Sequence, residues 1–223
     1  MKSAGEMNRR YFREAYRSGV HGWGVEEPSA YAVRNLRRIA KEQRGGRMLD
    51  IGCGEGRHAI AAAKMGFKAV GIDFEELALE RARRFARAVG AARVEFRKAD
   101  ALKMPFKEGE FDVVMDYGCL HHQRKTDWGR YKASLLRVLK ERGYYVLSVF
   151  SPRFRMFRGS RRRWHVAHGA YRRNFTAKEI ERLFGQEFEV MEMVEEKGEG
   201  GGFWHVLMRR RGGTDQCKIG LFT

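Results

Sequence analysis

The sequence predicts an α/β fold: a doubly wound, mostly parallel sheet of seven strands with helices on both faces and an antiparallel last strand. Three observations support this prediction. Short apolar segments typical of strands alternate along the chain with segments of helical periodicity. A glycine-rich turn joins the first strand-like segment to a helix of small residues. The 223 residues, of which 43% are hydrophobic, suit one domain of this kind.

The predicted elements follow each other in one coherent order. Two helices, at about Met7 to Ser18 and Pro28 to Gln43, precede the first strand. Five strands are expected near residues 47–52, 68–73, 93–97, 111–116 and 143–150, with helices between them.

Periodicity and capping residues define the later helices. Phe74 to Val89 and Asp127 to Leu139 show the three-to-four spacing of one buried face. The tripeptide ERG at 141–143 is expected to turn the chain. Thr176 and Glu179 have the spacing of a capping box, which predicts a helix from Thr176 to Phe184. Two closing strands, FEVMEMVEE and FWHVLMRRR, are joined by KGEGGG and are therefore expected to be antiparallel neighbours at one edge.

These elements divide one domain of residues 1–223 into consecutive parts. The divisions are N-terminal lid helices (1–45), a ligand-binding core (46–150), a basic insertion (151–175), a C-terminal helix and strand pair (176–211) and an irregular tail (212–223).

Composition restricts the environment of the protein. No segment approaches the roughly 18 consecutive apolar residues of a membrane span, and the first 16 residues lack the apolar stretch of a secretion signal. We therefore expect a cytoplasmic protein. The three cysteines (Cys53, Cys119 and Cys217) contain no CxxC pair, so they predict neither a disulfide framework nor a zinc site. Few Gln and Asn beside 33% charged residues are typical of a thermophilic source.

The most specific local pattern is LDIGCGEGRHA, from Leu49 to Ala59. Asp50 closes an apolar strand, and Gly52, Gly54 and Gly56 follow before the helix. Glycines permit the tight turn and let a ligand lie directly against the main chain. The GxGxG spacing differs from the GxGxxG of dinucleotide-binding folds. An acid two residues before the first glycine suits a cationic group better than a phosphate.

Acids also end the next strands. Asp73 closes KAVGID at about the separation of an acid that binds a ribose diol, whose two donors one carboxylate can accept. Asp100 follows the third strand, and FDVVMDYGCLHH is a buried fourth strand ending near Asp116. Individually, Asp73 could cap a helix, Asp100 could be a turn residue and Cys53 could be a small buried residue. Their joint order at four strand ends favours a ligand site.

Together these motifs resemble those of Rossmann-like (class I) methyltransferases that use S-adenosylmethionine. The resemblance implies S-adenosyl-L-methionine as cofactor and S-adenosyl-L-homocysteine as product. It implies that Asp50 faces the amino-acid part of the cofactor, beside a turn formed by Gly52, Cys53, Gly54 and Gly56.

The same resemblance assigns roles to the other strand ends. Asp73 would bind the ribose, and Asp100 would accept from the adenine amino group. The Ala101 N–H would reach a ring nitrogen, and Phe74 would pack on the adenine face. The segment beginning with Asp116 and Tyr117 would lie beside the transferable methyl group.

The N-terminal stretch narrows the resemblance. Tyr11 to Leu36 is similar to the lid of small-molecule methyltransferases of the tellurite-resistance and thiopurine type, in which a tyrosine-containing helix precedes a tryptophan, an acidic turn and a proline. Trp23 is the candidate for covering the cofactor. An aromatic side chain that only locks the N-terminal helices to the sheet remains the alternative.

Methyl transfer needs few catalytic groups. A sulfonium methyl is already activated, so the protein mainly aligns the nucleophile, methyl carbon and sulfur and excludes water. If the acceptor loses a proton, His121 is the candidate base; the alternative is a packing histidine. No acid cluster accompanies His121 and His122, so no metal site is predicted. DYGC replaces the (D/N)PP(F/Y) motif of enzymes that methylate exocyclic amines, and Cys119 lacks the context of a nucleophile.

The strongly basic composition bears on which kind of molecule accepts the methyl group. The 45 Lys and Arg exceed the 28 Asp and Glu by 17. Arg153 to Phe175 contains eight arginines, no acid and five aromatic residues other than histidine, and it follows the fifth strand at the ligand-binding edge. It could clamp a phosphate or carboxylate or hold RNA, or it could be a solvated loop.

Three functions are therefore carried forward. The first is methylation of a small molecule, either anionic or with a soft acceptor atom, which the compact chain and the lid favour. The second is methylation of tRNA or rRNA, which the charge favours. The third is a non-catalytic cofactor-binding partner subunit. The sequence indicates neither the acceptor atom nor the oligomeric state.

Overall fold

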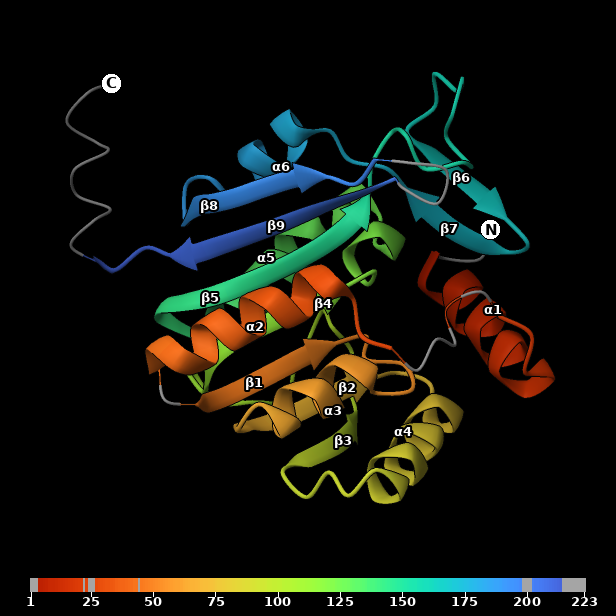
Figure 1. Ribbon diagram of the computed structural model, residues 1–223. Helices are drawn as coiled ribbons and strands as arrows, with labels where there is room; N and C mark the ends of the chain where they lie inside the picture. Colours follow the sequence, from red (N-terminus) through yellow and green to blue (C-terminus); the bar gives the residue numbers. More distant parts are fainter. Residues whose placement is uncertain (1–3, 22, 24–26, 44, 198–201, 214–223) are drawn as a thin grey trace, which may run out of the picture.

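A seven-stranded sheet forms the centre of the protein in the computed structural model, which describes all residues except 1–3, 22, 24–26, 44, 198–201 and 214–223 (Figure 1). The strand order is β3-β2-β1-β4-β5-β9-β8. The first five strands are parallel, and β9 runs antiparallel to both β5 and β8. The predicted fold class, including the antiparallel last strand, is confirmed. The strands are β1 (Gly46–Ile51), β2 (Phe67–Asp73), β3 (Val94–Lys98), β4 (Phe111–Tyr117), β5 (Leu139–Phe150), β8 (Phe188–Glu195) and β9 (Phe203–Arg210).

Helices cover both faces of this sheet. One core layer joins α2, α3 and α4 to the strands, and the opposite layer joins α5 and α6 to them. In Figure 1, α2 and α3 lie in front of the sheet and α5 lies behind it. The helices are α1 (Ala4–Ser18), α2 (Ala30–Gln43), α3 (Arg57–Lys64), α4 (Glu76–Ala88), α5 (Trp128–Val138) and α6 (Ala177–Phe184), with short 3-10 helices η1 (Leu120–His122) and η2 (Lys125–Asp127).

The capping box is present as the sequence predicts. The Thr176 hydroxyl accepts from the Glu179 N–H, and the Glu179 carboxylate accepts from the Thr176 N–H. This reciprocal bonding satisfies two backbone donors that have no partner within α6, and it explains why the helix begins at Ala177.

The predicted turn at 141–143 is a local bend within a strand rather than a break between two elements. Strand β5 already begins at Leu139 and continues through these residues to Phe150. Arg142 takes a left-handed conformation with φ 58°, and the register with β4 shifts between Phe111 and Val113. A local bulge therefore absorbs the irregular segment without ending the strand.

The basic insertion contains a β-hairpin that was not predicted. Strands β6 (Trp164–Ala167) and β7 (Ala170–Arg173) pair antiparallel. His168 and Gly169, at the connection, have φ values of 50° and 77°, the positive pair that a tight primed turn requires. In Figure 1 this hairpin and α1 lie next to each other at the carboxyl end of the parallel strands. The predicted tail at 212–223 falls largely outside the described residues.

Candidate functional site

A cavity of about 660 Å³ opens where the carboxyl ends of the parallel strands meet α1 and the basic insertion. Its wall includes the loops after β1, β2, β3 and β4, together with Phe150 at the end of β5 and Phe154, Arg155 and Met156 beyond it. Open α/β sheets bind ligands at this edge, and the volume suits a ligand of drug or cofactor size.

The glycine turn after β1 forms one side of the cavity. Gly52 and Gly54 have φ values of 68° and 53°. A Cβ at Gly52 would lie 2.9 Å from the Cys119 Cβ, and one at Gly54 would lie 2.8 Å from the Tyr16 hydroxyl. The main chain at Gly52 and Gly54 therefore faces the cavity without an intervening side chain. Cys53, which lies between the two glycines, also lines the cavity.

Gly56 has a different role from its neighbours. It precedes α3 with φ 84°, and a Cβ there would lie 2.6 Å from the Phe96 ring. Gly56 is not one of the described residues that line the cavity. This glycine lets α3 pack closely on the sheet and on Phe96, which is a structural contribution to the turn.

Asp50 contributes a carboxylate oxygen without a partner. The residue is 1% exposed and lines the cavity, and its Oδ2 has no hydrogen bond to any described residue. Burial, reinforced by the Asp116 carboxylate, raises the pKa of Asp50 to about 8. A buried acceptor of this kind is costly unless a ligand donates to it, so Asp50 marks the place of a donor or a cation.

Asp73 fixes the glycine turn from the neighbouring strand. Its Oδ2 accepts from the Gly54 N–H at 3.0 Å and its Oδ1 accepts from the Glu75 N–H at 2.9 Å. Burial raises the pKa of Asp73 to about 6. Each oxygen keeps accepting capacity toward the cavity, because a carboxylate oxygen has two lone pairs.

Asp100 and Ala101, which follow β3, and Phe74, which follows β2, supply a more open part of the cavity wall. The Asp100 carboxylate accepts from the Leu102 N–H and forms an ion pair with Arg9 of α1 at 3.0 Å. The Arg9 guanidinium also lies over the Phe74 ring, 5.3 Å from its centroid. Helix α1 thus covers this end of the cavity.

Trp23 joins the cavity wall and an aromatic cluster. Its Nε1 donates to the Tyr16 hydroxyl at 3.0 Å, and its ring stacks on His21 with centroids 4.8 Å apart. The ring also contacts Phe12. The position is compatible with both predicted roles, the cover over a ligand and the lock on the N-terminal helix.

Of the two predicted residues at the end of β4, only Tyr117 lines the cavity. Asp116 does not line the cavity. Its carboxylate instead accepts from the Cys119 and Leu120 N–H groups at 2.7 and 2.9 Å and from the Tyr131 hydroxyl at 2.5 Å. It thereby holds the start of η1. Burial raises the pKa of the Cys119 thiol well above its usual range, which agrees with a packing role.

His121 and His122 both line the cavity on η1. Burial lowers the pKa of His121 well below its usual range and that of His122 to about 4. The Phe150 N–H donates to His121 Nδ1, so the lone pair on that nitrogen is occupied. His122 Nδ1 lies 2.8 Å from the Tyr171 carbonyl oxygen.

Asn8 was not predicted as a site residue, yet it is 6% exposed on α1 and lines the cavity. Its amide donates to the His122 carbonyl and accepts from the Tyr171 N–H, both at 2.8 Å. One side chain thus joins α1, η1 and β7. The only sequence signal was an amide in an amphipathic helix, and its partners lie 114 and 163 residues away.

Charged side chains from two parts of the chain line the cavity. Asp50, Asp73 and Asp100 follow β1, β2 and β3, whereas Arg155 and Arg172 belong to the basic insertion beyond β5. Arg172 is 8% exposed and donates to the Ala167 carbonyl. Arg155 is exposed and has no hydrogen bond or ion pair to the described residues. Arg9, Arg57 and Arg81 also line the cavity, and Arg9 and Arg81 form ion pairs with Asp100 and Glu55. Arg155 and Arg172 have no carboxylate partner among the described residues, so the insertion gives the cavity a basic end.

Several arginines of the insertion stabilise it internally. Arg163 and Arg173 both form ion pairs with Glu179, and Arg173 also lies over the Trp128 ring. Arg153 pairs with Glu195, and Arg158 donates to the Arg153 carbonyl. Much of the charge predicted to contact a ligand therefore holds the hairpin against α6 and β8.

The described residues provide neither a metal-binding cluster nor a membrane-spanning helix. They contain no group of three or more His, Cys, Asp or Glu side chains arranged to hold a metal ion. They also contain no helix with the length and apolar character needed to cross a membrane.

Comparison with known proteins gives consistent matches. The methyltransferase domain family matches residues 42–198. An uncharacterized methyltransferase of Schizosaccharomyces pombe is 33% identical over 119 residues, which are 52% of this chain and 81% of that protein. The 27-O-demethylrifamycin SV methyltransferase of Amycolatopsis mediterranei is 35% identical over 56% of this chain and 46% of its own length.

A solved structure extends the similarity of fold to nearly the whole chain. The 1,6-didemethyltoxoflavin-N1-methyltransferase of Burkholderia thailandensis, bound to 1,6-didemethyltoxoflavin and S-adenosylhomocysteine, superposes with a TM-score of 0.75. The match covers 95% of this chain and 92% of that one at 24% identity.

Proposed function

This chain belongs to the methyltransferase domain family and is an S-adenosylmethionine-dependent methyltransferase, and on this premise we propose that it methylates a small anionic molecule bound at the basic end of the cavity. The observation that carries the proposal is that two arginines of the basic insertion, Arg155 and Arg172, line the cavity without a carboxylate partner among the described residues. The tellurite-resistance and thiopurine-type group remains a proposal for the finer relationship, supported only by the lid sequence.

The residues at the carboxyl ends of β1, β2 and β3 suit the cofactor. The unpartnered Asp50 oxygen fits the ammonium group of its amino-acid part, beside the bare main chain of Gly52 and Gly54. Asp73 would accept from the ribose hydroxyls, and Phe74 with Asp100 would surround the adenine. When bound, S-adenosylmethionine supplies a methyl group on a positively charged sulfur.

The residues at the basic end would hold and orient the acceptor. Arg155 and Arg172 offer guanidinium donors to an anionic group, and Phe150 and Phe154 provide apolar contact. Helix α1 and the hairpin both line the cavity, where they would exclude water and hold the nucleophile in line with the methyl carbon. Binding and alignment are the main contribution of this chain to the reaction.

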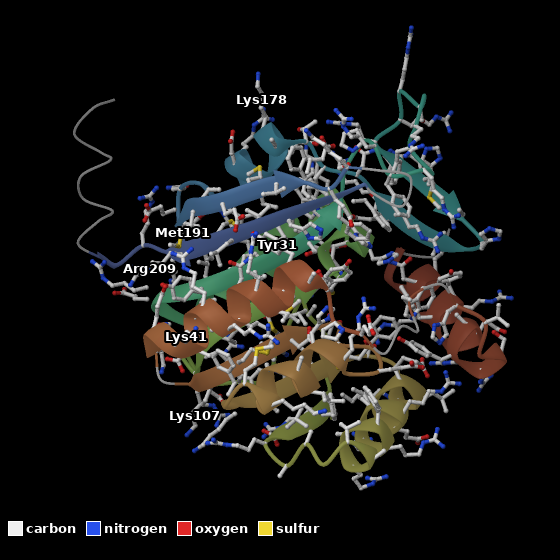
Figure 2. All side chains as sticks on the ribbon, in the orientation of Figure 1. Tyr31, Lys41, Lys107, Lys178, Met191 and Arg209 are labelled. Carbon is white, nitrogen blue, oxygen red and sulfur yellow. The ribbon has the colours of Figure 1, made fainter. Side chains whose placement is uncertain are left out.

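An RNA acceptor is the alternative that the net charge suggests. Two observations favour the small molecule. Several arginines of the insertion are engaged in internal ion pairs. Other basic side chains lie away from the insertion: in Figure 2, Lys178 lies at the top of the molecule, whereas Lys41 and Lys107 lie at its lower left. A continuous basic track for a polynucleotide backbone would gather them on one face.

Methyl-labelled S-adenosylmethionine and a cell extract test the proposal. The extract is separated into RNA, protein and small-molecule fractions after incubation with the purified protein. We expect label in the small-molecule fraction, on a compound retained by an anion exchanger. Label confined to RNA would contradict the proposal, and no transfer to any fraction would favour a non-catalytic partner subunit.

Replacing Arg155 tests the anionic character of the acceptor. Arg155→Ala is expected to raise the KM for the labelled compound about fivefold, the effect of losing about 1 kcal/mol at an exposed ion pair. The matched control is Arg162→Ala, because Arg162 is exposed on the same insertion but does not line the cavity. Equal KM values for both variants would show that the acceptor does not use Arg155.

Replacing Asp73 tests the cofactor end. Asp73→Ala is expected to weaken S-adenosylmethionine binding by about 1 to 3 kcal/mol, the range for a lost charge-assisted hydrogen bond. Calorimetry measures the affinity. Thermal unfolding of the cofactor-free variant provides the control, because Asp73 also fixes Gly54 and Glu75. An unchanged affinity would remove Asp73 from the site.

A further inference from the structure

Two adjacent histidines face the cavity with different hydrogen-bond partners at Nδ1. The His121 and His122 rings lie with centroids 4.5 Å apart and planes inclined by 63°. His121 Nδ1 is approached by the backbone N–H of Phe150 at 3.3 Å. His122 Nδ1 is approached by the backbone carbonyl of Tyr171 at 2.8 Å. One partner can only donate and the other can only accept.

These partners determine which nitrogen of each neutral ring carries the proton. His121 Nδ1 must be bare to accept from Phe150, so its proton is on Nε2. His122 Nδ1 must carry the proton to donate to Tyr171, so its Nε2 is bare. Burial favours the neutral form of both rings, since it lowers both pKa values. Neither Nε2 has a hydrogen-bond partner among the described residues.

Rotation of either ring by 180° is unfavourable. The rotation would place a carbon of His122 against the Tyr171 carbonyl and a C–H of His121 against the Phe150 N–H. His121 is also stacked on the Phe150 ring with centroids 3.7 Å apart.

The backbone on both sides of the pair is anchored as well. Asn8 binds the carbonyl of His122 and the N–H of Tyr171, so it fixes the donor ring and its acceptor relative to each other. Asp116 fixes the N–H groups of Cys119 and Leu120 at the start of η1. The opposite tautomers are therefore a stable property of the fold.

We propose that His122 Nε2 accepts a proton from an O–H or N–H of the methyl acceptor while His121 Nε2–H donates to a lone pair on the same molecule. This proposal rests on the proposed function. In the step, the acceptor atom forms a bond to the methyl carbon, the carbon–sulfur bond breaks with its electron pair left on sulfur, and the acceptor proton moves to His122. His122 then returns this proton to solvent.

The pair of rings also defines a class of acceptor. A molecule that satisfies both carries an ionisable hydroxyl or ring N–H near a carbonyl oxygen or ring nitrogen. Phe12, Phe150 and Phe154 line the same cavity and favour a flat, unsaturated framework. The anionic group bound by Arg155 and Arg172 is then a separate substituent. His122, rather than the sequence candidate His121, is the base in this arrangement.

Nitrogen NMR tests the tautomers without any acceptor. Long-range ¹H–¹⁵N correlation spectra of protein labelled at histidine distinguish Nδ1–H from Nε2–H rings, and spectra of His121→Asn and His122→Asn identify the two signals. We expect His121 protonated at Nε2 and His122 protonated at Nδ1 at neutral pH. His122 protonated at Nε2 would overturn the proposal.

The same variants provide a matched kinetic test. Asparagine at 122 can still donate to the Tyr171 carbonyl, and asparagine at 121 can still accept from the Phe150 N–H, so each variant keeps the Nδ1 bond and loses the Nε2 function together with the ring contacts. Label transfer to the small-molecule extract fraction is measured from pH 6.5 to pH 10. His122→Asn is expected to slow transfer about 100-fold at neutral pH, within the range for general-base catalysis. The deficit should shrink as the acceptor ionises by itself.

His121→Asn is expected to raise the KM for the acceptor about tenfold, with a deficit that does not change with pH, since it loses a donor and no base. A His122→Asn deficit that is equally independent of pH would indicate a structural role and overturn the proposal. The absence of transfer by the unaltered protein contradicts the proposed function itself. Altered tautomers with transfer intact contradict only the assignment of His122.

Discussion

The affinity for S-adenosylmethionine is expected to rise roughly 25-fold between pH 6 and pH 7.5, because Asp50 must lose its proton to bind the cofactor ammonium group. The pKa of Asp50 is raised to about 8 in the cofactor-free protein, so the carboxyl is mostly protonated below that pH. A bound cation favours the ionised form. Binding therefore releases a proton, and affinity increases as pH approaches the pKa from below.

Asp50→Asn tests the same carboxylate in two ways. The variant should bind the cofactor weaker by about 3 kcal/mol or more at pH 7.5, the cost of removing one partner of a buried ion pair, and its affinity should lose most of its pH dependence. Calorimetry in buffers of different ionisation enthalpy measures affinity and proton release together. If Asp50→Asn and the unaltered protein release equal numbers of protons on binding, the released proton comes from a group other than Asp50.

The cofactor-free variant should also be more stable than the unaltered protein at high pH. A folded-state pKa raised from 3.8 to about 8 gives stability that is present below pH 4 and lost as pH rises toward 8. The difference in unfolding free energy between Asp50→Asn and the unaltered protein should thus grow by about 3 kcal/mol from pH 5 to pH 8. Buried histidines with lowered pKa values, such as His58, act in the opposite direction but cancel in this difference.

Tyr131→Phe is expected to lower the free energy of unfolding by about 1.5 to 3 kcal/mol, the range for a hydrogen bond to a charged group. The Tyr131 hydroxyl donates to Asp116 at 2.5 Å and helps to offset the burial that raises the pKa of this carboxyl to about 6. Without it that pKa rises further, so Asp116 takes up a proton near neutral pH. A protonated carboxyl holds the N–H groups of Cys119 and Leu120 less strongly, and η1 loosens.

Tyr145→Phe is the matched control, because the Tyr145 hydroxyl bonds to Tyr131 at 3.0 Å and the change removes only a bond between neutral groups. Its expected cost is about 1 kcal/mol. Thermal unfolding and methyl transfer are measured for both variants. Tyr131→Phe should slow transfer more than it weakens cofactor binding, since Asp116 lies outside the cavity wall. Equal effects of the two variants on stability and transfer would show that Asp116 does not control η1.

The sequence predicted best what depends on short spacing. Asp50, Asp73 and Asp100 each close a strand of a parallel sheet, and the fold brings all three to one cavity as expected. The Thr176–Glu179 capping box is equally local. Gly56 matched the same motif, yet its backbone faces Phe96, a residue that no spacing rule connects to it.

Contacts between distant segments account for what the sequence did not reveal. Arg163 and Arg173 of the basic insertion form ion pairs with Glu179 of α6. These pairs are not visible in the sequence, so the number of arginines alone suggested a surface that is free to bind a ligand. Which ring nitrogen carries the proton in His121 and in His122 depends on Phe150 and Tyr171, which follow them by 29 and 49 residues. Two identical neighbours in the sequence thus acquire opposite chemical character from their partners.

Asn8 gives the N-terminal helix a role beyond covering the cavity. Its amide holds η1 and β7 at once, so a displacement of α1 that breaks both of its bonds would also free the backbone of His122 and Tyr171. Because the Tyr171 carbonyl lies against Nδ1 of the His122 ring, such a displacement would weaken the constraint on that ring. The position of the covering helix and the orientation of the proposed base are thus coupled through one amide.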